Sequence, residues 1–190
     1  MVAVLAGGRG ARLGGEKAMM PLGGTPIICR PLAAARDAGL KAVVVAKPST
    51  RLPALAERVV YEPESPRHPL CGVVAALELA ASRAPAPGVL LLACDMPFVT
   101  SPLLAWLAGL DGAAVAATDG RLQPLLARLL NEHLPQLREA LAEQRPLRAA
   151  LAALDPRIVD ERELARFGDP RRLCFNVNDA EDLRQAEGWL

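Results

Sequence analysis

The chain has 190 residues, of which 52% are hydrophobic, and its 22 Lys and Arg nearly balance its 21 Asp and Glu. This length suits one domain of roughly 100–200 residues, and the apolar content excludes a disordered chain. A net charge of +1 argues against a broad surface for nucleic acid or for an anionic membrane. We therefore expect one globular domain, residues 1–190, in which any polyanion that binds is small.

Short apolar runs alternate along the chain with stretches rich in Ala, Leu and Arg. The runs span residues 2–6, 42–46, 59–61, 89–93 and 113–117. Such alternation indicates βαβ units, and continuously apolar strands are typical of a parallel sheet buried on both faces. The predicted fold class is α/β: a three-layer α/β/α sandwich around a Rossmann-like, mostly parallel sheet.

The first predicted strand runs directly into a glycine-rich segment, residues 7–17. It holds five glycines together with Arg12 and Lys17. Glycines let backbone N–H groups approach an anion closely, and the two cations add charge, so the segment predicts a phosphate cradle. The spacing fits neither the dinucleotide fingerprint, which would need glycine at Leu13, nor the P-loop, which would need lysine at Glu16.

Three helix starts are predicted from capping residues. Thr25 precedes Pro26 and Ser101 precedes Pro102, and in each pair a hydroxyl stands before a proline suited to the first helical turn. Asp179 is expected to cap the last helix in the same way.

The apolar run at residues 89–93 ends in a single carboxylate, Asp95, shortly before Pro97. In a parallel sheet Asp95 would open onto the same edge as the glycine-rich segment. One carboxylate at such a point suits Mg²⁺, which commonly takes one or two protein carboxylates and completes its shell with water and phosphate oxygens. We therefore expect Asp95 to bind a magnesium ion.

The second half of the chain predicts an antiparallel addition to the sheet. Residues 118–121, Thr-Asp-Gly-Arg, read as a hairpin turn that leads into a strand near residues 123–129. Residues 130–154 predict two helices interrupted around Arg145 and Pro146. Residues 175–179 predict a short strand whose two asparagines, Asn176 and Asn178, lie on one face.

The four cysteines lie far apart, without the spacing of zinc ligands, and are expected to be small core residues. No run reaches the roughly 18 apolar residues of a membrane span, and the first residues do not read as a signal peptide. We expect a reduced, cytoplasmic setting without a membrane or nucleic-acid partner.

Five segments carry a family resemblance. They are residues 5–17, 69–72 (Pro-Leu-Cys-Gly), 94–97 (Cys-Asp-Met-Pro), 123–125 (Gln-Pro-Leu) and 176–178 (Asn-Val-Asn). In this order they resemble the molybdenum cofactor guanylyltransferases, the MobA-like nucleotidyltransferases, over nearly the whole chain. The resemblance implies a fold of the nucleotide-diphospho-sugar transferase type and the transfer of GMP from GTP to the phosphate of molybdopterin or its molybdenum-loaded form, with pyrophosphate released.

The resemblance also implies residue roles. It places Lys17 and Arg12 on the triphosphate, Asp95 on Mg²⁺ and Glu62 in the acidic position that faces guanosine. The implied nucleotide-binding residues are Leu5, Ala6, Gly7, Gly8, Arg12, Lys17, Glu62 and Asp95, with Arg12, Lys17 and Asp95 as the catalytic residues.

On the acceptor side, the resemblance implies that Gln123, Asn176 and Asn178 face the pterin phosphate. Residues 69–72 would form a loop beside the ribose. Contact with other cofactor-assembly proteins is a further implication.

Several alternatives stay open. Residues 46–50 contain no asparagine, where relatives often place one to hold the nucleotide, so the base could be cytosine instead of guanine. A different phosphate acceptor and a non-catalytic nucleotide-binding protein are the other readings. An oxidoreductase that uses a dinucleotide is disfavoured by Leu13. No Ser, Cys or His stands in a nucleophile constellation, so we expect direct in-line transfer without a covalent enzyme intermediate.

Overall fold

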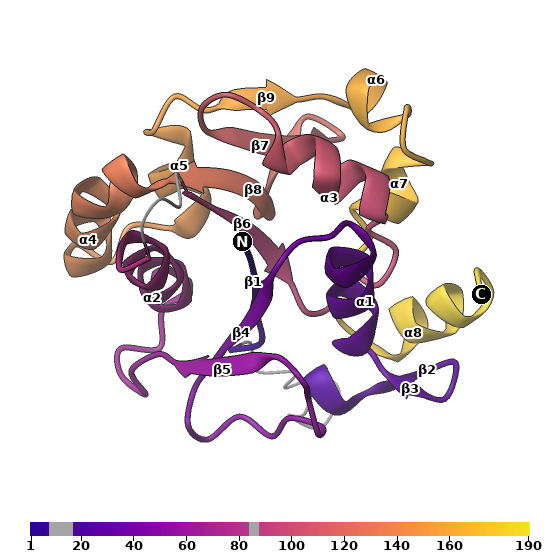
Figure 1. Cartoon of the computed structure of the whole chain (residues 1–190). Helices are drawn as coiled ribbons and strands as arrows, with labels where there is room; N and C mark the ends of the chain where they lie inside the picture. The colour runs from indigo at the N-terminus through magenta and orange to yellow at the C-terminus, as the bar shows by residue number, and fades with distance from the viewer. Residues whose placement is uncertain (8–16, 84–87) are drawn as a thin grey trace.

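The computed structural model describes residues 1–7, 17–83 and 88–190. Within these ranges seven strands form one sheet in the order β5-β4-β1-β6-β8-β7-β9 (Figure 1). Their bounds are β1 Val2–Leu5, β4 Ala42–Ala46, β5 Arg58–Tyr61, β6 Gly88–Ala93, β7 Ala114–Thr118, β8 Arg121–Leu130 and β9 Arg157–Val159.

The sheet is mostly parallel, as predicted. Strand β1 pairs in parallel with β4 and β6, β4 with β5, and β7 with β9, whereas β8 runs antiparallel to both β6 and β7. The expected hairpin joins β7 to β8, with Thr118 opposite Arg121. Its central residues, Asp119 and Gly120, have φ values of 49° and 67°, as a two-residue hairpin turn requires.

Helices cover both faces of the sheet and confirm the three-layer architecture. Helices α1 (Cys29–Asp37) and α3 (Ser101–Ala108) share one buried cluster with Val2 and Val4. The other cluster contains Ala3 and residues of α2 (Pro69–Ala81), α4 (Leu134–Ala142) and α5 (Leu147–Ala152). Neighbouring residues of β1 therefore face opposite layers, because side chains alternate along a strand.

The remaining elements lie around this sandwich. The short helices are α6 (Glu161–Leu164) and α7 (Pro170–Leu173), followed by α8 (Ala180–Glu187). Helix α8 lies beside a small hairpin, β2 (Pro21–Leu22) and β3 (Thr25–Pro26), at one side of the molecule (Figure 1). Across the described ranges, no helix combines the length and the apolar character needed to cross a membrane.

Two of the predicted helix starts are wrong in detail. Thr25 and Pro26 form strand β3, because Gly23 and Gly24, at φ 62° and 77°, turn the chain into a hairpin. Helix α1 begins later, at Cys29. Ser101 is the first helical residue of α3 rather than its cap.

Of the other predictions for the second half of the chain, some are confirmed and one is wrong. Asp179 does cap α8, since its side chain accepts hydrogen bonds from the N–H groups of Glu181 and Asp182. The two helices of residues 130–154 form as α4 and α5. Residues 175–179 do not form a strand. Cys71, Cys94 and Cys174 are buried, as expected for core residues, and Cys29 is half-buried.

Candidate functional site

Four parallel strands end at the same edge of the sheet. The register sets Leu5 of β1 beside Val45 of β4 and Ala93 of β6, and Ala46 beside Tyr61 of β5. The residues that follow these strands are therefore brought together, although they are far apart in the sequence. They are Ala6 and Gly7, Lys47, Glu62, and Cys94 with Asp95.

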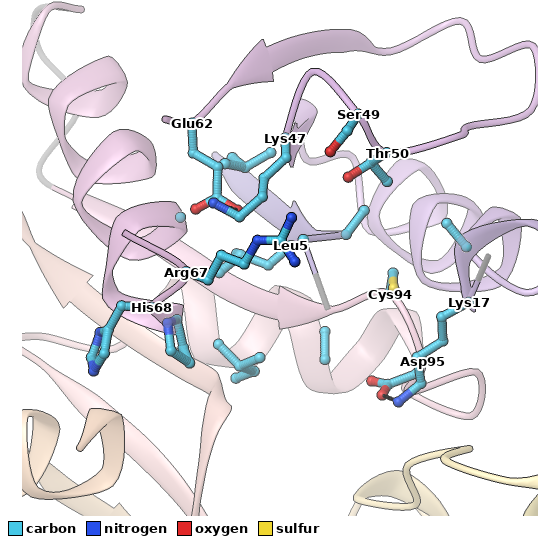
Figure 2. Close-up of a pocket in the computed structure, with 18 of the residues that line it drawn as sticks. Leu5, Lys17, Lys47, Ser49, Thr50, Glu62, Arg67, His68, Cys94 and Asp95 are labelled. Atoms are coloured by element: carbon cyan, nitrogen blue, oxygen red, sulfur yellow. Dashed lines mark ion pairs between the residues drawn. The ribbon is translucent and has the colours of Figure 1, made fainter. Parts of the chain in front are cut away.

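These residues line a cavity of about 780 Å³, a size that suits a small-molecule site. Figure 2 shows that two pairs of charged residues lie at separate ends of the cavity. Lys17 and Asp95 lie at one end, and Lys47 and Glu62 lie at the other, with Leu5 between them. Four basic side chains, Lys17, Lys47, Arg51 and Arg67, and two acidic ones, Glu62 and Asp95, belong to the described lining. This excess of positive charge favours an anionic ligand.

Lys17 connects three parts of the chain at the first end. It begins the short 3-10 helix η2 (Lys17–Met19), and its ammonium group contacts the Asp95 carboxylate at Oδ2. The same Nζ donates a hydrogen bond of 2.9 Å to Oδ1 of Asn178. The side chains of Lys17 and Asp95 are each 12% exposed, so this pair is shielded from water much more than a surface salt bridge.

A backbone hydrogen bond positions Asp95, and one of its carboxylate oxygens has no hydrogen-bond partner among the described residues. Its C=O accepts a hydrogen bond of 3.0 Å from the N–H of Val177. Its Oδ1 is buried and has no hydrogen-bond partner within the described ranges. Burying a carboxylate oxygen without a hydrogen-bond partner costs free energy. A ligand that binds to Oδ1 would remove this cost.

Glu62 and Lys47 form the second end. Both side chains are nearly buried, with the whole residues 5% and 8% exposed. Nζ of Lys47 lies 3.7 Å from Oε1 of Glu62 and donates to the carbonyl oxygen of Pro63 at 2.5 Å. Burial raises the pKa of Glu62 above its ordinary value, and Lys47 opposes this rise without cancelling it. Oε2 of Glu62 is buried without a partner in the described part of the chain.

Two glycines make room for the Glu62 carboxylate. A Cβ on Gly7 would lie 2.2 Å from Oε1, far inside van der Waals contact. A Cβ on Gly72 would lie 3.2 Å from Oε2 and 3.1 Å from Cδ2 of Leu5. The absence of side chains at Gly7 and Gly72 therefore lets the carboxylate sit against the first strand.

The segment expected to form a loop beside the ribose is helical. Residues 69–72 are the first turn of α2, and Nδ1 of His68 caps that turn by accepting from the N–H of Leu70 at 3.2 Å. The prediction of a loop was wrong because Pro69 fits the first turn of a helix. His68, Pro69 and Gly72 nevertheless line the cavity.

The expected nucleotide-binding residues gather here as far as they are described. Leu5, Ala6, Gly7, Lys17, Glu62 and Asp95 all line the cavity. Gly8 and Arg12 lie outside the described residues.

The three expected acceptor-binding residues do not line the cavity. Asn178 bonds to Lys17 at its edge, and Nδ2 of Asn176 donates to the carbonyl of Cys174. Nε2 of Gln123 donates to the hydroxyl of Thr118.

The sequence reasoning missed Lys47 and Arg67. Arg67 points across the cavity toward Leu5 (Figure 2). Neither residue belongs to a sequence motif. Lys47 directly follows β4, and Arg67 directly precedes His68, the cap of α2; these positions were the only indication in the sequence. Cys94 also lines the cavity, but burial, aided by the Asp95 charge, raises the pKa of its thiol to about 12. It is therefore a protonated packing residue.

Comparison with known proteins gives a consistent picture. The model of the MobA-like NTP transferase domain matches residues 2–158. A molybdenum cofactor guanylyltransferase of Sinorhizobium fredii is 34% identical, over 98% of this chain and 90% of that protein. A protein of the same name from Pseudomonas putida is 32% identical, over 90% of this chain and 94% of its own length.

Solved structures extend the similarity to three dimensions. Molybdopterin-guanine dinucleotide biosynthesis protein A of Archaeoglobus fulgidus superimposes with a TM-score of 0.80 at 27% identity, covering 99% of this chain and 97% of the other. A 2-C-methyl-D-erythritol 4-phosphate cytidylyltransferase of Thermus thermophilus superimposes with a TM-score of 0.65 at 24% identity, over 99% and 97% of the two chains. At that lower identity, the second likeness concerns the fold alone.

Proposed function

The chain belongs to the MobA-like NTP transferase family, and from this premise we propose that it transfers GMP from GTP to the phosphate of molybdopterin and releases pyrophosphate. The relatives named molybdenum cofactor guanylyltransferase support this choice of substrates. They match 98% and 90% of this chain.

One observation carries the proposal: two lysine–carboxylate pairs, Lys17 with Asp95 and Lys47 with Glu62, lie at separate ends of one cavity. Lys17 ends the glycine-rich segment that predicts a phosphate cradle, and Oδ1 of Asp95, which has no partner among the described residues, suits a magnesium ion that would accompany a triphosphate. We therefore place the phosphates at Lys17 and Asp95, and the base at Glu62 and Lys47. Leu5, Ala6 and Gly7 lie between these ends and would support the ribose.

Magnesium is part of the proposal, and the residues present fit it. Asp95 offers an oxygen-only donor, and its buried Oδ1 lacks a partner in the described ranges. Those ranges contain no group of three or more His, Cys, Asp or Glu that could hold a metal. Asp95 alone suits Mg²⁺, which keeps several waters and binds through few carboxylates. When bound, the ion would offset the charge of the phosphates.

The chemistry requires positioning rather than a covalent enzyme intermediate. An oxygen of the acceptor phosphate forms a bond to the α-phosphorus of GTP, and the bond from that phosphorus to the bridging oxygen breaks, so that its electron pair leaves with pyrophosphate. Phosphate monoesters are largely ionised at neutral pH, so the acceptor needs no general base. Lys17 would bind the phosphates and stabilise the charge that develops on the leaving pyrophosphate.

The test is pyrophosphate release with Mg²⁺, GTP and molybdopterin. We expect Lys17→Ala and Asp95→Asn each to lower kcat/KM by about 10²–10³, the usual loss for an electrostatic contact made in the transition state. Lys41→Ala is a matched control, since Lys41 is exposed and does not line the cavity.

Product analysis with GTP and CTP would complete the test. Formation of the guanine dinucleotide cofactor supports the proposal. Undiminished turnover in both the Lys17 and Asp95 variants, or a product formed from CTP alone, would overturn it.

A further inference from the structure

The base end of the cavity contains a buried lysine, Lys47, to which the proposed function assigns no hydrogen bond. Lys47 follows β4 directly, and Glu62 follows β5 directly. The parallel register that sets Ala46 beside Tyr61 makes these two residues neighbours. Figure 2 shows both side chains directed toward each other at the wall of the cavity.

Lys47 and Glu62 do not satisfy each other's hydrogen-bonding groups, as a purely structural ion pair would. Nζ of Lys47 has three protons. One is directed to the carbonyl of Pro63, and the distance of 3.7 Å to Oε1 of Glu62 is too long for a hydrogen bond. Oε2 of Glu62 has no partner among the described residues. The pair therefore retains both donor and acceptor capacity while being shielded from water, and unused capacity of this kind is costly in a buried place.

A donor beside an acceptor matches one edge of a nucleobase. Guanine presents the acceptor O6 next to the N1–H and N2–H₂ donors, whereas adenine presents an N6–H₂ donor where guanine has O6. A carboxylate can accept from two neighbouring N–H groups, and an ammonium can donate to O6. Adenine in the same place would oppose a donor to the ammonium and its N1 lone pair to the carboxylate, which is a repulsive arrangement.

We propose that Lys47 is a specificity-determining residue that donates to O6 of guanine while Glu62 accepts from the N1–H and N2–H₂ groups. This inference rests on the proposed function, because it takes the base to lie at this end of the cavity. The chain would thereby select a 6-oxopurine with a lysine–glutamate pair. Relatives often have an asparagine within the segment that corresponds to residues 46–50, and this chain has none.

The test measures dissociation constants by calorimetry, with Mg²⁺ and four triphosphates. GTP is the reference, and ITP lacks only the N2 amine. The triphosphate of 2,6-diaminopurine riboside keeps the N2 amine but has an amine in place of O6 and a lone pair in place of N1–H, and ATP lacks the N2 amine as well. Lys47→Met removes the donor and keeps the length of the side chain. We expect it to weaken GTP binding by about 10- to 100-fold, the usual value of a hydrogen bond from a charged donor.

The pattern across the ligands separates base reading from mere support of the fold. The preference for GTP over the diaminopurine nucleotide should fall by about 10-fold or more in Lys47→Met. Part of it should remain, because Glu62 still meets the N1–H of guanine but the N1 lone pair of diaminopurine. The preference for GTP over ITP should stay within about twofold of the wild-type value, because both bases carry O6. Lys47→Gln, which keeps an uncharged N–H donor, should recover part of the lost preference. Lys41→Met is the control for removal of a lysine from an exposed place.

The outcomes are distinguishable from those of the pyrophosphate-release test. Equal weakening of all four nucleotides, or unchanged ratios in both Lys47 variants, would overturn the inference and leave the proposed function standing. Selective loss of O6 recognition in a protein that does not act on molybdopterin would support the inference and remove the proposed acceptor. A wild-type protein that binds none of the four nucleotides would overturn both.

Discussion

At the scale of single residues, Glu62 shows how a ligand site is maintained at the expense of stability. Its residue is 5% exposed, and the nearby Lys47 does not fully compensate for burial, so the pKa of the carboxyl is raised. A group with a raised folded-state pKa binds its proton more tightly in the folded chain than in the unfolded chain. Ionised Glu62 therefore opposes folding until a ligand with N–H donors satisfies it.

This effect predicts a pH-dependent difference between the wild type and Glu62→Gln without ligand. The stability that protonated Glu62 contributes is present below the ordinary glutamate pKa of about 4.3 and is lost as pH rises through the raised folded-state pKa. In thermal unfolding between pH 4 and pH 8, the midpoint of the glutamine variant should rise relative to that of the wild type as pH rises. Glu187→Gln, at an exposed carboxyl, is the control. A gap that shrinks toward pH 8 would contradict this account.

At the scale of elements, the central strands were predictable and the site that they build was only partly so. The apolar runs at residues 42–46 and 89–93 predicted β4 and β6, because strands buried on both faces carry no polar alternation. Asp95 was found because it is the first carboxylate after such a run. Lys47 and Glu62 could not be recognised as a pair, since their proximity depends on the register between β4 and β5, which the local sequence does not encode.

The failures at the small elements have similar causes. Strand β9 has three residues at the edge of the sheet and carries little pattern. Residues 175–178 alternate apolar and polar side chains, as a strand would. Within the described ranges the segment makes no ladder with a strand, and the N–H of Val177 donates instead to the carbonyl of Asp95. Local pattern predicts elements that bury a face, whereas these segments are placed by tertiary contacts.

Helix α8 has a cap whose loss can be measured. Asp179 accepts from two N–H groups of the first turn, each at 3.0 Å. Asp179→Ala should destabilise the protein by about 1 kcal/mol, which corresponds to roughly 2–4 °C in the unfolding midpoint for a chain of this size. Calorimetry of this variant beside Asp111→Ala, at an exposed aspartate outside any helix, is the comparison. An equal midpoint in the two variants would show that the cap contributes nothing.

At the scale of the whole molecule, distant parts of the chain meet at the phosphate end of the cavity. Lys17 comes from the first segment of the fold, Asp95 from the middle and Asn178 from near the end. Asp179, the cap of helix α8, follows Asn178, and α8 packs beside the β2–β3 hairpin (Figure 1). Asn178 and the packing of the last residues therefore help to hold Lys17, in addition to its contact with Asp95.

Trp189 anchors this arrangement. Its ring centroid lies 5.4 Å from that of Phe98 and 4.8 Å from that of Phe175, both nearly edge-to-face. The Arg172 guanidinium lies over the Trp189 ring and donates to the Trp189 carbonyl at 2.7 Å. Aromatic pairs of this geometry contribute about 0.5–1.5 kcal/mol each beyond the area that they bury.

Trp189→Ala should therefore affect both stability and phosphate binding. We expect a lower unfolding midpoint, and weaker binding of GTP as well as of pyrophosphate alone, because Asn178 no longer fixes Lys17.

Trp106→Ala is the matched control. Trp106 lies in α3, packs on Phe167 with ring centroids 5.2 Å apart, and does not line the cavity. It should lower the midpoint and leave pyrophosphate affinity unchanged. The preference for GTP over ATP should survive in both variants, since the base end is built from β4 and β5. Equal loss of pyrophosphate affinity in the two tryptophan variants would mean that general loosening, and not the contact at Asn178, controls the phosphate end.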